Sequence, residues 1–113
     1  MSLELLNKLK EEQGGHCVLS HSERVERDHF IPISWGTGLG DVYENVVYME
    51  KGLNISKGNR HPFIWIKKQP HFVQRRFHNE LVPMLAERNG MTAKEFEEYV
   101  TKCYEEFVNR EEV

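Results

Sequence analysis

The sequence predicts an α+β fold in which one helix, two strands and then further helices follow one another along the chain. Apolar residues recur at helical spacing near both ends, whereas two short β-prone segments lie between them on either side of a glycine-rich loop. The chain has 113 residues, of which 39% are hydrophobic, including 6 Phe, 4 Tyr and 2 Trp. This size and composition fit one small core, so we expect residues 1–113 to form a single domain.

A short amphipathic helix is expected at residues 2–12. Leu3, Leu6 and Leu9 recur at about helical spacing, and Ser2 can cap the N-terminus. Two consecutive glycines follow this segment and should end the helix.

The middle of the chain predicts two strands and a short helix. Residues 24–31 alternate as a strand that Pro32 would end, and residues 45–49 form the second strand. Residues 34–41 hold three glycines and are expected to be a loop. Residues 52–58 are expected to make one or two helical turns.

The second half is predicted to be helical. Pro62 suits the first turn of a helix over residues 63–68, and a second helix covers residues 71–88 with a break or restart near Pro83. Gly90 is well placed to stop it.

A final helix begins at a capping box formed by Thr92 and Glu95. Its apolar positions recur at the intervals expected for a stripe that packs against a core. These positions are Phe96, Val100, Cys103 and Phe107.

Charge is distributed unevenly along the chain, although the net charge is only -3. Residues 51–79 contain seven basic side chains and no acidic one. Such a stretch is either a solvated basic face or a surface that contacts phosphates, and charge alone does not decide between them. The basic residues are Lys51, Lys57, Arg60, Lys67, Lys68, Arg75 and Arg76.

Several functional classes are disfavoured by composition. No apolar run is long enough for a transmembrane helix, and the N-terminus lacks the basic and apolar regions of a secretory signal. We therefore expect a cytoplasmic protein without membrane partners, whose two cysteines, Cys17 and Cys103, are free thiols.

The span from Asp28 to Pro62 contains the residue types of a catalytic group. The Asp28 carboxylate and an asparagine amide oxygen are hard oxygen ligands suited to Mg²⁺, and His29 can take a proton from water. Lys57 adds a cation for a phosphate. Together these groups suffice to hydrolyse a phosphodiester bond.

The order of these residues resembles the HNH nuclease family, whose ββα-metal core consists of two antiparallel strands, an Ω-like loop and one helix. The resemblance covers roughly residues 16–66, and residues 71–110 would be a C-terminal helical extension. It is similar in particular to small phage and bacterial HNH endonucleases and to the HNH domain of CRISPR effector nucleases. The matching segments are Asp28-His29-Phe30-Ile31-Pro32, Asn45 before an apolar strand, and Asn54-x-x-Lys57-Gly58-Asn59-x-x-Pro62.

The resemblance implies a role for each residue. Asp28 and Asn54 would bind one divalent metal, and His29 would be the general base. Asn45 would hold the loop through backbone hydrogen bonds so that His29 is aimed correctly. Lys57 would approach the scissile phosphate or steady the helix. Mg²⁺ is the expected ion, with Mn²⁺ and others as alternatives.

A structural zinc is not expected. Many HNH proteins hold one with two C-x-x-C pairs, but Cys17 has no partner at that spacing.

The function implied is that of an endonuclease acting on double-stranded DNA in a bacterial or phage-infected cell. An alternative is a catalytically inactive nucleic-acid-binding module of the same fold; a third is an interaction protein that uses its acidic C-terminal helices. A protein partner could supply specificity, and both a monomer and a homodimer are compatible with the sequence. Trp35 is expected to rest on DNA, and three histidines in the basic stretch are expected to be solvated or near phosphates: His61, His71 and His78.

Overall fold

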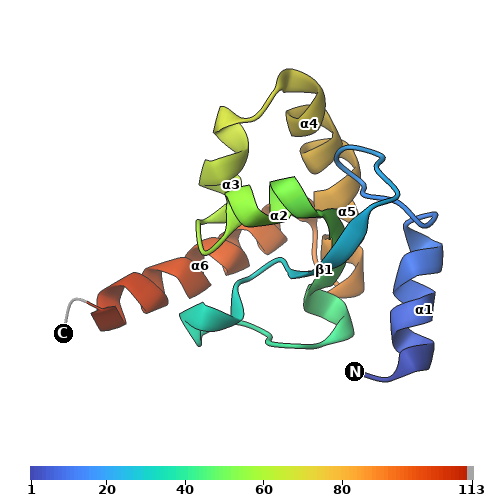
Figure 1. Cartoon of the computed structure of the whole chain (residues 1–113). Helices are drawn as coiled ribbons and strands as arrows, with labels where there is room; N and C mark the ends of the chain where they lie inside the picture. Colours follow the sequence, from blue (N-terminus) through green and yellow to red (C-terminus); the bar gives the residue numbers. More distant parts are fainter. Residues whose placement is uncertain (112–113) are drawn as a thin grey trace.

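The computed structural model describes residues 1–111 and contains helices together with one two-stranded antiparallel sheet (Figure 1). The α+β class is thereby confirmed. The helices and strands are α1 (Leu3–Glu12), β1 (Val25–His29), β2 (Val46–Glu50), α2 (Lys51–Lys57), α3 (Pro62–Trp65), α4 (His71–Arg76), α5 (Val82–Arg88) and α6 (Ala93–Glu111). Short 3₁₀ turns occur at Ile33–Trp35, Tyr43–Asn45 and Ile66–Lys68.

Helix α1 packs against β2 at the N-terminal side of the molecule. It begins as expected, with the Ser2 hydroxyl accepting a hydrogen bond from the Leu5 N–H at 3.2 Å. The helix is followed by Gln13, whose buried side chain accepts from the Tyr48 N–H and donates to the Tyr48 carbonyl, both at 2.8 Å. This amide therefore continues the hydrogen bonding of the sheet where β2 would otherwise be an open edge.

The two strands are shorter or shifted relative to the expected ranges. β1 stops at His29, two residues before the expected end, because the Phe30 and Ile31 N–H groups turn to the backbone and side chain of Asn45. β2 begins at Val46, which pairs with His29, while Asp28 lies opposite Val47. The register places the end of β1 beside the start of β2.

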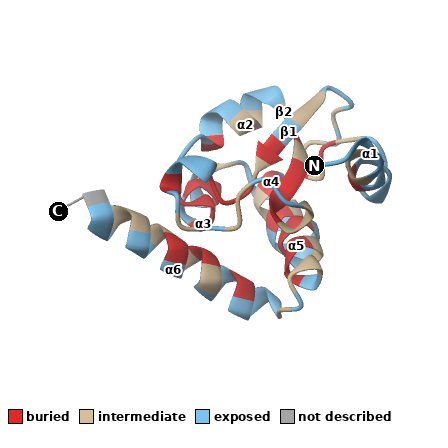
Figure 2. Cartoon of the chain, turned by 90° about the horizontal axis from the view of Figure 1, so that it is seen from below, coloured by how far each residue is buried: buried red, intermediate tan, exposed pale blue. Residues whose placement is uncertain are grey.

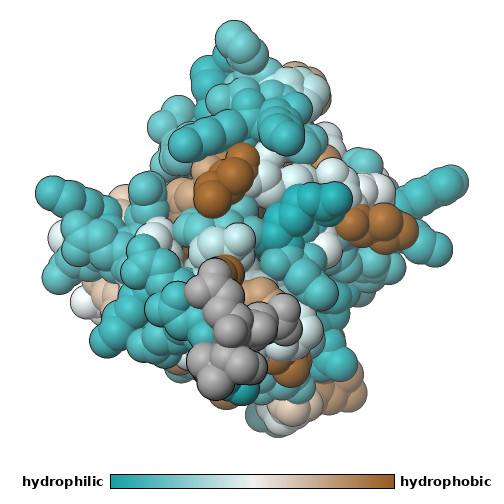
Figure 3. Space-filling model, turned by 90° about the vertical axis from the view of Figure 1, so that its left-hand side faces the viewer, coloured by the Kyte–Doolittle hydropathy of each residue, from teal (hydrophilic) through white to brown (hydrophobic). Residues whose placement is uncertain are grey.

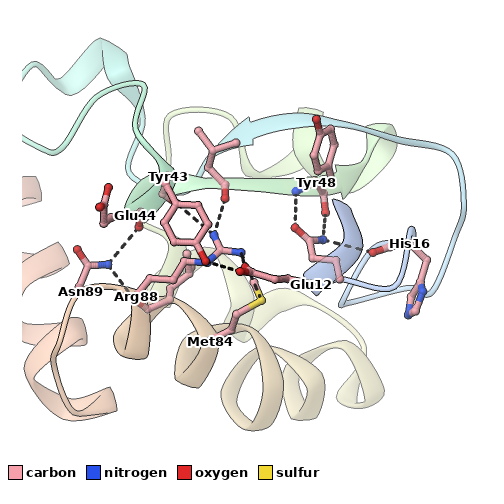
Figure 4. A network of polar contacts seen from close by, with 11 residues as sticks. Glu12, His16, Tyr43, Glu44, Tyr48, Met84, Arg88 and Asn89 are labelled. Atoms are coloured by element: carbon pink, nitrogen blue, oxygen red, sulfur yellow. Dashed lines mark hydrogen bonds and ion pairs between the residues drawn. The ribbon is translucent and has the colours of Figure 1, made fainter. Parts of the chain in front are cut away.

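One arginine side chain joins the start of β2 to the helical half. Arg88 on α5 donates to the carbonyl oxygens of Tyr43 at 3.2 Å and Val46 at 2.7 Å, and it pairs with the Glu12 carboxylate at 3.2 Å (Figure 4). The guanidinium also lies over the Tyr43 ring. One side chain therefore links α5, the turn before β2 and α1.

The helical half matches the expected boundaries closely. Pro62 opens α3, and the segment predicted as one helix over residues 71–88 is α4 and α5 joined by a π-helical segment, Phe77–Leu81. The π-helical segment takes the place of the expected break, and α5 begins at Val82, next to Pro83.

Helix α6 begins at the capping box. The Thr92 N–H donates to the Glu95 carboxylate at 2.9 Å, and the Glu95 N–H donates to the Thr92 hydroxyl at 3.1 Å. The buried side of α6 faces the other helices, and its outer side is exposed (Figure 2). Of the expected stripe, three residues are buried and Phe107 is partly buried.

Several residues of the sheet segment, among them Phe30, Val47 and Met49, belong to the same core as the helices. Phe30 is fully buried, and its ring lies 5.6–6.1 Å from the rings of Phe63, Phe77 and Phe96. The backbone that follows His29 is thus fixed by helices α3 and α6 and the π-helical segment. Both cysteines are buried free thiols, and no helix among residues 1–111 is long and apolar enough to cross a bilayer.

Candidate active site

A polar cleft of about 330 Å³ lies where the end of β1 meets the C-terminal end of α2. Asp28 and His29 reach it from β1, and Asn54 reaches it from α2. The rest of its lining comes from the neighbouring loops and strand: Arg27, Pro32, Ile33, Ser34, Gly58 and Asn59.

Adjacent strand residues normally point to opposite faces of a sheet, yet Asp28 and His29 border the same cleft. β1 ends at His29, so the chain leaves the strand there and the alternation no longer holds. The Asp28 side chain is 8% exposed and that of His29 is 24% exposed. The acid is therefore the inner member of the pair and the imidazole is the outer one.

Lys57 lies behind the cleft rather than in it. Its side chain is completely buried, with Nζ 3.3 Å from the Asp28 Oδ2 and within 3.3 Å of the His29 and Phe30 carbonyl oxygens. The expectation that Lys57 binds a phosphate is therefore wrong, since substrate cannot reach a buried ammonium. It ties the end of β1 to α2.

Burial and the charge of the partner act in opposite directions on the pKa of each member of the Asp28–Lys57 pair. Burial raises the pKa of Asp28, and the positive charge of Lys57 opposes that rise. Burial likewise lowers the pKa of Lys57, against the effect of the Asp28 charge. Asp28 Oδ2 is buried and accepts no well-aligned hydrogen bond from any residue within 1–111, so the ion pair is its main stabilisation.

Asn54 is held by an acidic residue that the sequence interpretation missed. Its Nδ2 donates to the Glu26 carboxylate at 2.8 Å, which leaves Oδ1 as the atom able to bind a cation. Glu26 lies two positions before Asp28 in β1, so both project from one face of the strand. That two-residue spacing was a signal available in the sequence.

Asn45 holds the loop between the strands as expected. It is buried, its Oδ1 accepts from the Ile31 N–H at 2.8 Å, and its Nδ2 donates to the carbonyl oxygens of Ile31 and Gly40, each at 3.0 Å. One amide thus fixes both ends of the glycine-rich loop.

A second acidic residue, Asp41, contacts the histidine. Asp41 Oδ1 lies 2.8 Å from His29 Nε2 and 3.9 Å from Nη1 of Arg27. The hydrogen bond from His29 holds the pKa of the Asp41 carboxyl below its usual value. No spacing rule marked Asp41, because the loop that brings it to His29 has no regular period.

Five of the seven basic residues are exposed, namely Lys51, Arg60, Lys67, Lys68 and Arg75. Arg76 is half-buried and donates to the Leu19 carbonyl at 3.0 Å, so part of its hydrogen-bonding capacity serves the fold. The surface seen from the side of α3 and the end of α6 is largely hydrophilic, with separate hydrophobic patches (Figure 3).

Two aromatic groups expected near nucleic acid are core residues instead. Trp35 is 1% exposed, stacks on Phe107 and donates to the Asn59 carbonyl at 2.8 Å. His61 is also buried; it caps α3 by accepting the Phe63 N–H. Both expectations are wrong because α6 folds over these side chains, whereas His71 and His78 are exposed as expected.

A larger cavity, of about 870 Å³, lies beside this cleft and shares Asn59 with it. Its lining includes Arg60 and Lys68 together with the exposed side chains of Ile55 and Ile64, and it contains no carboxylate. Since it lacks both an acid and an oxygen-rich cation site, we place the candidate active site in the smaller cleft.

The donors in the cleft fit a hard divalent cation. Asp28 lines the cleft with a carboxylate whose Oδ2 faces Lys57, and Asn54 offers an amide oxygen. Mg²⁺ keeps several waters and needs few protein ligands, so two oxygens suffice. Within the described part of the chain no three His, Cys, Asp or Glu side chains converge as a metal cluster.

Comparison of the chain with models of protein families, with characterised proteins and with solved structures finds no match.

Proposed function

We propose that this protein is a metal-dependent endonuclease of the HNH type that hydrolyses DNA phosphodiester bonds. The observation that carries the proposal is the convergence of Asp28, His29 and Asn54 on one polar cleft, although Asn54 comes from a different element. The succession of β1, a long loop, β2 and α2 agrees with the strand, loop, strand and helix order of that family.

Each side chain has a defined part in this proposal. His29 takes a proton from the attacking water, and Asp28 and Asn54 would hold one divalent ion. That ion, Mg²⁺ or Mn²⁺, would supply charge stabilisation for the phosphate and the leaving oxygen. Lys57 keeps the Asp28 carboxylate in place from behind, and Asn45 holds the loop that faces His29.

The exposed basic residues supply the attraction to the DNA backbone. Arg60 and Lys68 line the larger cavity next to the cleft, so a strand that passes Asn59 would meet two cations. Since phosphate contacts release counterions, affinity should fall steeply with salt.

The first experiment measures nicking of supercoiled plasmid with Mg²⁺, with Mn²⁺ and with EDTA. We compare the wild type with His29→Ala and with His71→Ala, a matched control because His71 is exposed on α4 and does not line the cleft. We expect metal-dependent nicking that His29→Ala reduces by about 10²- to 10⁴-fold and His71→Ala leaves unchanged. Cleavage that survives His29→Ala would contradict the proposal.

A second experiment measures the shift of the melting temperature on addition of Mg²⁺ or Mn²⁺. Asp28→Asn and Asn54→Ala should abolish the shift, whereas His29→Ala should keep it, because the imidazole is assigned to the proton and not to the ion. Equal loss in all three variants would make His29 a ligand. Salt-sensitive DNA retention without cleavage or metal effect in the wild type would favour the inactive binding module.

A further inference from the structure

The contact between His29 and Asp41 has a chemical consequence for the imidazole. His29 Nε2 and Asp41 Oδ1 are 2.8 Å apart, the distance of a charge-assisted hydrogen bond. The lowered pKa of Asp41 keeps its carboxyl ionised at neutral pH, and the guanidinium of Arg27 nearby acts in the same direction.

An ionised carboxylate accepts hydrogen bonds and cannot donate one. The hydrogen of the contact must therefore be carried by Nε2 of His29. In the neutral ring the other nitrogen, Nδ1, then holds the free electron pair. Nδ1 makes no hydrogen bond to any residue that the structure describes, so it is free to meet a water molecule.

The position of Asp41 is itself fixed. Asn45 Nδ2 donates to the carbonyl oxygen of Gly40, the residue just before Asp41, at 3.0 Å. The same amide bonds to the backbone of Ile31, two residues after His29. Asn45 thus fixes the backbone near His29 and the backbone next to Asp41 relative to each other.

We infer that Asp41 is a positioning residue that fixes His29 as the Nε2-protonated tautomer and leaves Nδ1 as the nitrogen that accepts a proton from water. The tautomer follows from the contact alone, whereas its role in cleavage rests on the proposed nuclease function. Without the carboxylate, the ring would divide between two tautomers, and only one of them presents a basic Nδ1.

The direct test is the tautomer of His29, read from its ring ¹⁵N chemical shifts at about pH 8, where a free imidazole is neutral. We compare the wild type with Asp41→Ala, which removes the acceptor, and with Glu44→Ala. Glu44 is a matched control because it lies in the same loop and its carboxylate forms no hydrogen bond or ion pair with a residue in 1–111. We expect the Nε2–H form in the wild type and in Glu44→Ala, and a mixture in Asp41→Ala. An Nδ1–H form in the wild type, or an unchanged ring in Asp41→Ala, would overturn the inference.

The second readout separates this inference from the proposed function. In the plasmid assay, Asp41→Ala should lower kcat by roughly 10- to 100-fold with little change in KM, the usual cost of losing a group that orients a functional histidine. Asp41 is exposed, so the melting temperature of the Asp41 variant should stay close to that of the wild type. If His29→Ala leaves cleavage intact, the nuclease role of His29 fails while the tautomer result still stands. If kcat of Asp41→Ala equals that of the wild type although His29 is required, the positioning role fails.

Discussion

The segment β1–β2–α2 and the helical half α3–α6 are stabilised by different interactions. Three of the buried polar side chains belong to the first: Asp28, Asn45 and Lys57. The second is packed mainly with aliphatic and aromatic groups, among them Phe77 and Phe96.

The difference teaches where orientation and stability come from. Hydrogen bonds and ion pairs have strict geometry, so they fix the direction of side chains but add little net stability. Apolar burial is non-directional and supplies most of the free energy of folding. Phe30 joins the two regions, because it follows His29 in the chain and packs among the rings of the helical core.

The strongest test of this contrast is the buried ion pair. Lys57→Met should lower the free energy of unfolding by about 3–5 kcal/mol, because the buried Asp28 carboxylate loses its counter-ion. The double variant Asp28→Leu with Lys57→Met should recover most of that loss in urea unfolding and yet show no cleavage. Lys68→Met, at an exposed lysine, is the control and should change stability by less than about 0.5 kcal/mol.

Failure of the double variant to recover stability would contradict the idea that the pair serves orientation. Phe96→Ala provides the counterpart in the helical half, where a cavity should cost about 3–5 kcal/mol.

The next effect concerns the loop. Asn45→Ala removes three hydrogen bonds from buried or half-buried backbone and should lower the free energy of unfolding by roughly 2–3 kcal/mol. It should also reduce cleavage more than its stability loss explains, because Asp41 is no longer held near His29. Asn79→Ala, at an exposed position in the helical half, is the control. A variant as stable and active as the wild type would show that the loop does not depend on this amide.

A smaller effect is expected at the start of α6. Thr92→Ala removes the side-chain cap and should cost about 1 kcal/mol in unfolding experiments. Plasmid nicking should be unchanged well below the melting temperature, because the cap lies outside the cleft lining. A marked loss of activity would mean that the two regions are coupled more tightly than their shared core and the Arg88 contacts imply.

The smallest effect is a pH dependence at His61. Burial lowers the pKa of His61 from its usual 6.5, with Glu97 opposing the shift. Below about pH 6.5 the unfolded chain therefore binds a proton that the folded chain does not, and stability falls as the pH decreases. His61→Asn keeps a cap acceptor for the Phe63 N–H and should show a shallower decline from about pH 7 to about pH 5. An identical decline in wild type and variant would contradict this assignment; His71→Asn is the control.

The sequence by itself determined the order of the elements and most of their ends. Capping by Ser2 and by the Thr92–Glu95 pair depends on residues three apart, and the apolar spacing of α1 and α6 repeats within a few turns. Such signals are local, so they can be read without the fold. The signal that places Asp28 and His29 together near the end of a strand is also local, because the two residues are adjacent in the sequence.

Only the tertiary structure decided how polar groups are used. Charge alone cannot distinguish Lys57, which is buried behind Asp28, from the exposed Lys68. The partner of His29 is Asp41, brought there by an irregular loop, and Trp35 is covered by a helix from the far end of the chain. These outcomes depend on contacts between distant residues, whose geometry follows from packing and not from any repeating pattern.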